Sequence, residues 1–208
     1  MRSFVRRLVI ALWALVLVAA LGFATRIYMV GRGGDSLVAG MGTDMAPSIG
    51  GPFALLDHTG KAVTDADFRG QWMLIYFGFT YCPDVCPTAL ITMVDAIDLL
   101  GDKGAKVVPV LVTVDPERDT PALLASYVAA FGPRLVGLTG TAEQITAVAK
   151  AYRVYYAKAK PKEGSADTYL MDHSSILYLV APDGKFRQHF SGHQIDADEL
   201  ARRLRNIL

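Results

Sequence analysis

The sequence has very little cysteine, with only Cys82 and Cys86 in 208 residues. Two cysteines four positions apart cannot cross-link a small secreted fold, which excludes a disulfide scaffold. The chain also has little net charge, +1 at pH 7 with histidine neutral. A protein that binds nucleic acid neutralises many phosphates with lysine and arginine. We therefore expect no nucleic-acid partner, and we expect the cysteine pair to carry chemistry.

A long stretch without charge lies near the N-terminus. Leu8 to Thr25 reads LVIALWALVLVAALGFAT and follows Arg2, Arg6 and Arg7. A helix of this length, rising about 1.5 Å per residue, covers nearly all of a hydrocarbon layer about 30 Å thick. The arginines favour a cytoplasmic N-terminus. The sequence therefore predicts a transmembrane anchor within residues 1–30. A cleaved signal peptide is the alternative, which the length of the apolar run disfavours.

The segments after the anchor differ in composition. Residues 31–51 are rich in glycine and show no hydrophobic periodicity, which predicts a flexible tether. The folded domain is expected over residues 52–208. No arginine- and serine-rich transit segment precedes the apolar run, which favours a bacterial over a mitochondrial membrane. We therefore expect a single-pass protein of the bacterial inner membrane, with its soluble domain on the periplasmic side.

Strands and helices alternate along the predicted domain. We expect strands over residues 52–57, 61–64, 72–79, 106–114, 135–138, 154–157, 175–180 and 185–190, and helices over residues 88–100, 120–131, 141–152 and 196–208. The run WMLIYFGF is apolar throughout, as in a central strand buried on both faces. Alternation early and a hairpin followed by a helix late predict an α/β sandwich with a mixed central sheet, which is the thioredoxin-like arrangement.

The cysteines follow a predicted strand and precede a predicted helix. At such a junction a sulfur meets unsatisfied backbone N–H groups and the positive end of the helix dipole, which favour thiolate over thiol. A thiolate both binds metal and attacks disulfides. If Cys82 and Cys86 lie on one face of a helix, they can form a disulfide or hold one ion together. The position alone does not choose between these roles.

Two thiolates are not a complete metal site. A structural zinc centre is normally closed by four protein ligands, and the sequence has no second cysteine pair. Two sulfurs with one imidazole suit Cu(I), with histidine adding tolerance of Cu(II). His173 is the candidate imidazole because it lies between the polar stretch 158–168 and the strand expected from residue 175; a solvated loop histidine is the alternative. We expect solvated or structural roles for the remaining histidines, His58, His189 and His193.

Three motifs closely resemble those of one known family. The run from Phe77 to Pro87, FGFTYCPDVCP, resembles the copper-site motif of the Sco/SenC family. Asp115 to Pro121, DPERDTP, resembles its second signature, and Asp172-His173-Ser174 resembles its third. The similarity extends from Pro52 to the C-terminus with the motifs in the family's order, and a membrane anchor before a thioredoxin-like domain is also usual there.

The resemblance implies a copper metallochaperone that is not itself an enzyme and has no catalytic residue. It implies one copper ion per chain, held by Cys82, Cys86 and His173. The expected partner is cytochrome c oxidase subunit II, whose binuclear copper centre the protein helps to assemble. Other copper chaperones or thiol–disulfide reductases are further expected partners. Asp115 and Asp172 are expected to orient the ligands from outside. Alternatively, Asp115 and Pro116 shape a turn, with Asp119 or Thr120 capping the following helix.

Two enzyme classes are the rival interpretations. A thiol–disulfide oxidoreductase would use Cys82 as the attacking thiolate and Cys86 as the resolving thiol, through a redox-active disulfide between them. Three residues between the cysteines, rather than two, argue against an ordinary thioredoxin motif. Reduction of the oxidase cysteines is compatible with copper binding, so both roles can coexist. A peroxidase would need one thiolate, but the sequence has no recognisable peroxidatic arrangement around it.

Overall fold

The computed structural model describes residue 13 and residues 17–26, 49–159 and 169–208. Residues 17–26 are helical. Within the described ranges, no helix is long and apolar enough to cross a membrane. Most of the predicted anchor, most of the predicted tether and residues 160–168 lie outside the described residues, so the predictions for those segments stay predictions. The unit Ser48–Leu208 is the compact domain.

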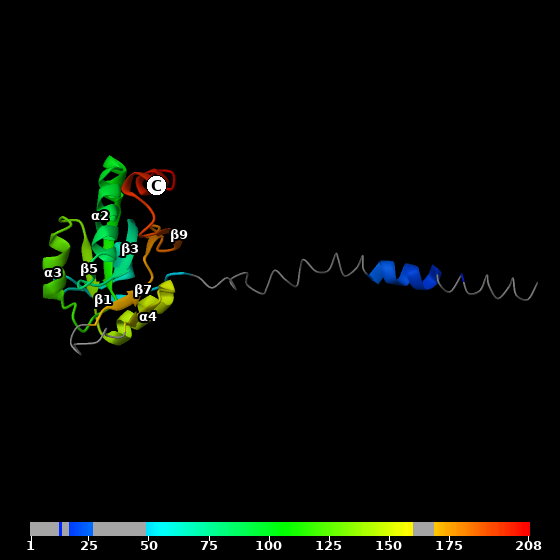
Figure 1. Ribbon diagram of the computed structural model, residues 1–208. Helices are drawn as coiled ribbons and strands as arrows, with labels where there is room; N and C mark the ends of the chain where they lie inside the picture. Colours follow the sequence, from blue (N-terminus) through cyan, green and yellow to red (C-terminus); the bar gives the residue numbers. More distant parts are fainter. Residues whose placement is uncertain (1–12, 14–16, 27–48, 160–168) are drawn as a thin grey trace, which may run out of the picture. The chain divides into compact units, whose positions relative to one another are not determined.

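The domain is built from short strands, helices and two 3-10 turns (Figure 1). In chain order these elements are β1 (Ala54–Asp57), β2 (Ala62–Thr64), η1 (Asp65–Phe68), β3 (Trp72–Gly78), α2 (Val85–Asp98), η2 (Gly101–Lys106), β4 (Val107–Thr113), α3 (Pro121–Ala129), β5 (Val136–Thr139), α4 (Ala142–Tyr152), β6 (Tyr156–Lys158), β7 (Met171–His173), β8 (Ile176–Val180), β9 (Phe186–Ser191) and α5 (Ala197–Arg205).

A seven-stranded sheet forms the centre of the domain, in the order β2-β1-β5-β4-β3-β8-β9. Strands β3, β4 and β5 run parallel, whereas β1, β2, β8 and β9 join by antiparallel pairing. The predicted mixed sheet is therefore confirmed. Strands β6 and β7 pair separately as a short antiparallel ribbon.

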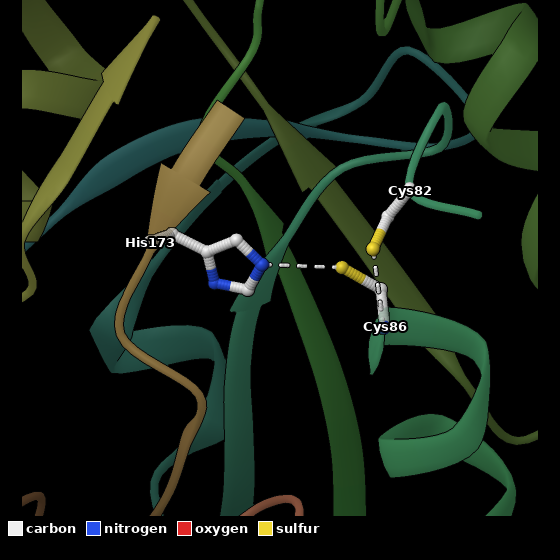
Figure 2. Close-up of side chains that lie close together, drawn as sticks. All are labelled: Cys82, Cys86 and His173. Carbon is white, nitrogen blue, oxygen red and sulfur yellow. Dashed lines mark hydrogen bonds between the residues drawn. The ribbon is translucent and has the colours of Figure 1, made fainter. Parts of the chain in front are cut away.

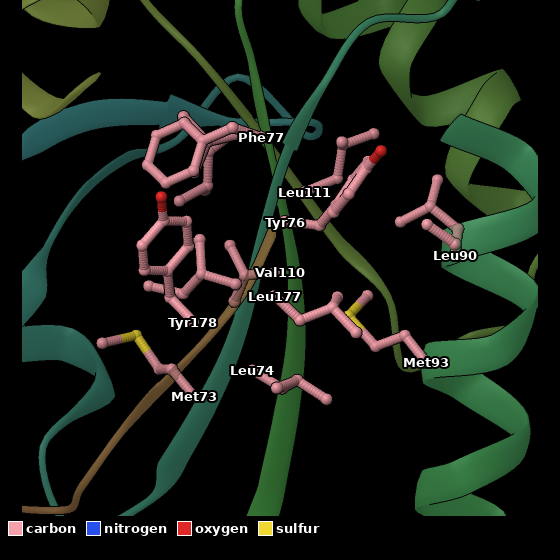
Figure 3. Packing of buried hydrophobic residues seen from close by; sticks show 14 of the residues in the cluster. Met73, Leu74, Tyr76, Phe77, Leu90, Met93, Val110, Leu111, Leu177 and Tyr178 are labelled. Carbon is pink, nitrogen blue, oxygen red and sulfur yellow. The ribbon is translucent and has the colours of Figure 1, made fainter. Parts of the chain in front are cut away.

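Strand β3 lies at the middle of the core because its side chains are apolar in both directions. Successive side chains of a strand point to opposite faces of the sheet. Figure 3 shows Tyr76 facing Leu90 of α2, with Phe77 and Tyr178 on the opposite face. On that opposite face the Phe77 ring lies 5.5 Å from the ring of Tyr152 in α4. Helices therefore cover both faces of the sheet, as in an α/β sandwich.

Parallel pairing of β3 and β4 decides where the site forms. Both strands end at the same edge, and the Val114 N–H there donates to the Gly78 carbonyl over 2.8 Å. From this edge one chain segment turns through the cysteines into α2, and the other turns through Asp115 into α3. The second signature motif therefore lies at the cysteine edge, as the sequence predicts for parallel neighbours.

Two local predictions differ from the structure. Helix α2 begins at Val85, three residues earlier than expected, because proline is tolerated in the first turn of a helix and Pro87 does not delay the start. The sequence does not predict strand β7, because three residues carry too little hydrophobic pattern to indicate a strand. His173 ends this strand and pairs with Tyr156 of β6. Backbone pairing, rather than an open loop, therefore places the histidine.

Candidate metal centre

Cys82, Cys86 and His173 converge at the cysteine edge of the sheet. Their candidate ligand atoms, the two sulfurs and one imidazole nitrogen, all lie within 4.8 Å of one another. Figure 2 shows the three side chains pointing toward one point from a loop, from α2 and from β7. The structure thus brings Cys86 close to His173, 87 positions later in the chain, as the resemblance to the family implies.

Cys82 lies in the turn before α2 and Cys86 lies inside the helix, so the two cysteines do not share one helix face. The pair still meets, because the Cys86 N–H donates to the Cys82 sulfur over 3.3 Å. This sulfur therefore accepts from one of the helix N-terminal N–H groups that have no partner inside the helix. Its position at the positive end of the helix favours the thiolate, as expected.

Cys86 lies in the first turn of α2 and is fully buried. Its sulfur lies 3.3 Å from Nε2 of His173. The space for this sulfur depends on Gly78 at the end of β3: a Cβ there would stand 3.1 Å from the Cys86 sulfur and 2.9 Å from the ring of Tyr76. The absence of a side chain at residue 78 therefore lets the sulfur approach the strand.

His173 is oriented by two aromatic rings and one carbonyl. The rings of Tyr76 and Phe79 meet the imidazole edge-on, with centroids 5.9 and 5.8 Å away. Nδ1 lies 3.2 Å from the carbonyl oxygen of Ser174. A carbonyl only accepts, so this hydrogen bond places the proton on Nδ1. The lone pair of Nε2 then faces the Cys86 sulfur, which is the arrangement that a metal-binding imidazole needs.

The pKa values of the two cysteine thiols are shifted in opposite directions. The hydrogen bond from Cys86 lowers the pKa of Cys82 to about 4, and hydrogen bonds from backbone N–H groups act in the same direction. The pKa of Cys86 is raised far above its ordinary value, first because its thiol donates to the Cys82 sulfur and then because it is buried. These shifts favour a thiolate at Cys82 and a thiol at Cys86. Both cysteines are free of a disulfide in the structure.

Comparison with known proteins decides the family. A family model described as SCO1/SenC matches residues 41–208. The chain belongs to the SCO1/SenC family. The resemblance seen in the three sequence motifs is thereby confirmed.

Relatives within the SCO1/SenC family match most of the folded domain. The mitochondrial SCO1 homologue of Homo sapiens is 50% identical over 146 residues, covering 69% of this chain and 48% of the relative. The chain thus spans about half the length of that relative.

Solved structures of the family share the fold. The copper-bound ScoI of Arabidopsis thaliana is 44% identical, with a TM-score of 0.72 over 76% of this chain and 97% of that one. BsSco, described as a member of the Sco family of cytochrome c oxidase assembly proteins with a disulfide switch, is 26% identical, with a TM-score of 0.59 over 80% of this chain and 96% of that one. These neighbours confirm the thioredoxin-like α/β fold.

The unequal acidities of this SCO1/SenC pair predict unequal reactivity in the reduced, metal-free chain. At pH 6 we expect iodoacetamide to label Cys82 and to leave Cys86 largely unmodified, because the thiolate is the nucleophile and the pKa of Cys82 lies near 4. Peptide mass spectrometry across pH 3–9 measures both sites. Labelling of Cys82 should fall only as the pH drops toward that pKa. A rise of Cys82 labelling near its ordinary pKa of about 8.5 would contradict the assignment.

Asp119 is a buried carboxylate that the sequence suggested only as a helix cap. It accepts hydrogen bonds from the backbone N–H and the hydroxyl of Thr80, over 3.1 and 2.6 Å, and from the hydroxyl of Thr113 over 2.6 Å. Burial raises its pKa. The cap of α3 is Thr120, whose side chain accepts from the Leu123 N–H. Asp119 thus links the cysteine loop, the segment between β3 and α2 that contains Thr80 and Cys82, to the end of β4. The sequence does not predict this role, because Asp119 and Thr80 are far apart in the chain.

The aspartates expected beside the ligands have other contacts. Asp115 is buried and accepts hydrogen bonds from Arg118 and from the hydroxyl of Tyr169, the latter over 2.8 Å. Asp172 is exposed. The group that accepts from Nδ1 of His173 is the Ser174 carbonyl rather than the Asp172 carboxylate. Thus neither contact of Asp115 is with a ligand residue.

The other histidines lie away from the three-residue cluster. His58 accepts from the Gly137 N–H over 3.2 Å, which is the structural role that the sequence predicts. His189 stacks on Phe186, and His193 is exposed.

Proposed function

We propose that this SCO1/SenC protein is a metallochaperone that holds one copper ion through Cys82, Cys86 and His173. The observation that carries the proposal is the convergence of the two sulfurs and Nε2 within 4.8 Å. Two soft sulfur donors and one imidazole fit Cu(I), and the imidazole also accepts Cu(II). Copper is seen in the Arabidopsis relative, which supports the choice of metal.

The proposed task is assembly of the binuclear copper centre of cytochrome c oxidase subunit II. The description of BsSco as a member of a family of oxidase assembly proteins supports the pathway. The site also suits transfer of its cargo. Cys82 is partly exposed, whereas Cys86 is buried, so an acceptor thiolate can reach the ion from the Cys82 side. Three ligands leave room for an incoming sulfur before a donor departs.

His173 distinguishes a copper carrier from a simple dithiol. We expect His173→Ala to lower Cu(I) affinity and to slow copper delivery to an isolated subunit II copper domain by about tenfold or more. His189→Ala is the matched control, because His189 stacks on Phe186 and contacts neither cysteine. Transfer is followed by the absorption of the acceptor's copper centre. Delivery by His173→Ala at the parental rate would contradict the proposal.

The proposed location is the inner membrane of a bacterium, with one membrane pass and the copper domain in the periplasm. The uncharged run from Leu8 to Thr25 and the preceding arginines support this topology. The human relative, in contrast, is described as mitochondrial. The other proposed partners are copper chaperones that load the site and reductases that maintain its thiols.

Thiol–disulfide exchange is a second proposed activity, favoured by the thiolate of Cys82 beside the buried thiol of Cys86. The Cys82 thiolate attacks one sulfur of a protein disulfide, and the other sulfur leaves as a thiolate. Cys86 then gives its proton to that leaving group and attacks Cys82, releasing the second target sulfur. The target gains two electrons, and Cys82 and Cys86 become a disulfide. A partner thiol–disulfide reductase must regenerate the pair. This activity needs no His173.

A further inference from the structure

The Arg118 guanidinium stands between the two chain segments that carry the metal ligands. It lies over the ring of Tyr169, 3.8 Å from the centroid, and over the ring of Tyr81, 4.6 Å away. Tyr81 directly precedes Cys82, and Tyr169 lies four residues before His173. A single side chain of the second signature motif therefore contacts both the cysteine loop and the segment that leads into β7.

The position of Arg118 is fixed by polar contacts as well as by stacking. It pairs with the buried carboxylate of Asp115, and one of its N–H groups donates to the Tyr169 carbonyl over 2.9 Å. The same carboxylate accepts from the Tyr169 hydroxyl over 2.8 Å. Arg118, Asp115 and Tyr169 thus form a closed set of contacts, which we term the arginine clamp. Nε of Arg118 donates to Asp115, Nη1 donates to the Tyr169 carbonyl, and the planar face of the guanidinium stacks on the Tyr169 ring. A lysine ammonium cannot make these three contacts together.

The segment that leads into β7 is also held by short backbone pairing, in which the Ala159 N–H donates to the Leu170 carbonyl over 2.8 Å. Strand β7 has three residues and pairs with β6, itself three residues long. Lys158 of β6 contributes a second cation over the Tyr169 ring, 4.6 Å from its centroid, and pairs with Glu117 in the same turn as Arg118. This exposed pair is weak by itself. The partly buried contacts of Arg118 therefore connect the turn after β4 to the segment that leads into the strand ending at His173.

We infer that Arg118 is a positioning residue that keeps His173 closed on the cysteines, and so sets how fast copper leaves the site. The inference rests on the proposed function. It also gives Asp115 an indirect role in orienting the ligands, through Arg118 and Tyr169. Stacking and the hydrogen bond to Tyr169 hold the His173 segment against the cysteine loop. When the arginine clamp is weakened, the His173 imidazole moves away from the cysteines more easily. The copper ion is then held by the sulfurs of Cys82 and Cys86 alone.

The test measures loss of Cu(I) from the loaded, detergent-solubilised full chain to excess bicinchoninate. Arg118→Lys keeps the charge beside Asp115 but removes the planar face. Tyr169→Leu removes the stacked ring and leaves the Arg118–Asp115 pair in place. Arg187→Lys is the control, since Arg187 is exposed on β9. We expect about tenfold faster copper loss for the first two variants and the parental rate for the control.

A double-mutant cycle separates positioning from general stabilisation. In a His173→Ala background, neither Arg118→Lys nor Tyr169→Leu should accelerate copper loss further, because the clamp acts through the imidazole. Parental rates in both single variants, or the same acceleration with and without His173, would overturn the inference while leaving copper binding intact. A parent chain that holds no copper would overturn the proposed function together with the inference.

Discussion

Replacing Cys86 by serine is expected to abolish stoichiometric copper binding, lowering the affinity for Cu(I) by more than about 100-fold. Cys86 supplies the only fully buried sulfur of the cluster, 3.3 Å from Nε2 of His173. A serine hydroxyl is a hard, neutral donor that Cu(I) binds poorly. Its size is close to that of the thiol, so the first turn of α2 should persist.

Titration of the reduced full chain with Cu(I) against a competing chelator measures this effect. Cys82→Ser should weaken binding strongly too, whereas His173→Ala should retain a weaker two-sulfur site. The unfolding temperature of each metal-free variant is the control for folding. One tightly bound copper ion in Cys86→Ser would show that the buried sulfur is not a ligand.

Replacing Gly78 by alanine is expected to damage the site without touching a ligand. The new methyl would stand 2.9 Å from the Tyr76 ring and 3.1 Å from the Cys86 sulfur. Tyr76 is itself fully buried and packs edge-on against His173, so it cannot yield without moving the imidazole. Overpacking of a core of this kind costs about 1–3 kcal/mol. We expect that loss in the free energy of unfolding, together with about tenfold or greater weakening of copper binding.

Gly51→Ala is the matched control for this substitution. A Cβ at residue 51 would meet the Ala151 side chain at 3.7 Å, which is an ordinary contact. In urea unfolding and Cu(I) titration, Gly51→Ala should therefore keep the parental stability and copper affinity, whereas Gly78→Ala should lose both. Parental stability and affinity in Gly78→Ala would contradict the account of why residue 78 is glycine.

Regular patterns made most of the fold predictable. The uninterrupted apolar run of β3, the helical spacing of α2 and the Pro-Asp-Gly turn before β9 each depend on neighbours in sequence. The placement of Cys82 and Cys86 between strand and helix also follows from local pattern. The ligand set itself required the resemblance to a family, because the residues alone left the choice of His173 open.

Most of the contacts that the sequence does not predict join segments that are distant in the chain. Asp119 meets Thr80 across 39 positions and Arg118 meets Tyr169 across 51, and no periodicity encodes such pairs. The carbonyl of Ser174 orients His173 through backbone geometry, which residue identity does not report. Strand β7 is too short to show a pattern. The contact of Asp119 with Thr80 arises because β3 and β4 end at one edge of the sheet.

Copper K-edge X-ray absorption on the full chain loaded with one equivalent of Cu(I) identifies the atoms that bind the ion. The account predicts two sulfur scatterers and one nitrogen scatterer around the ion, with the nitrogen absent in His173→Ala and one sulfur absent in Cys82→Ser. An ion surrounded only by nitrogen and oxygen, or the same spectrum in the parent and in His173→Ala, would contradict it.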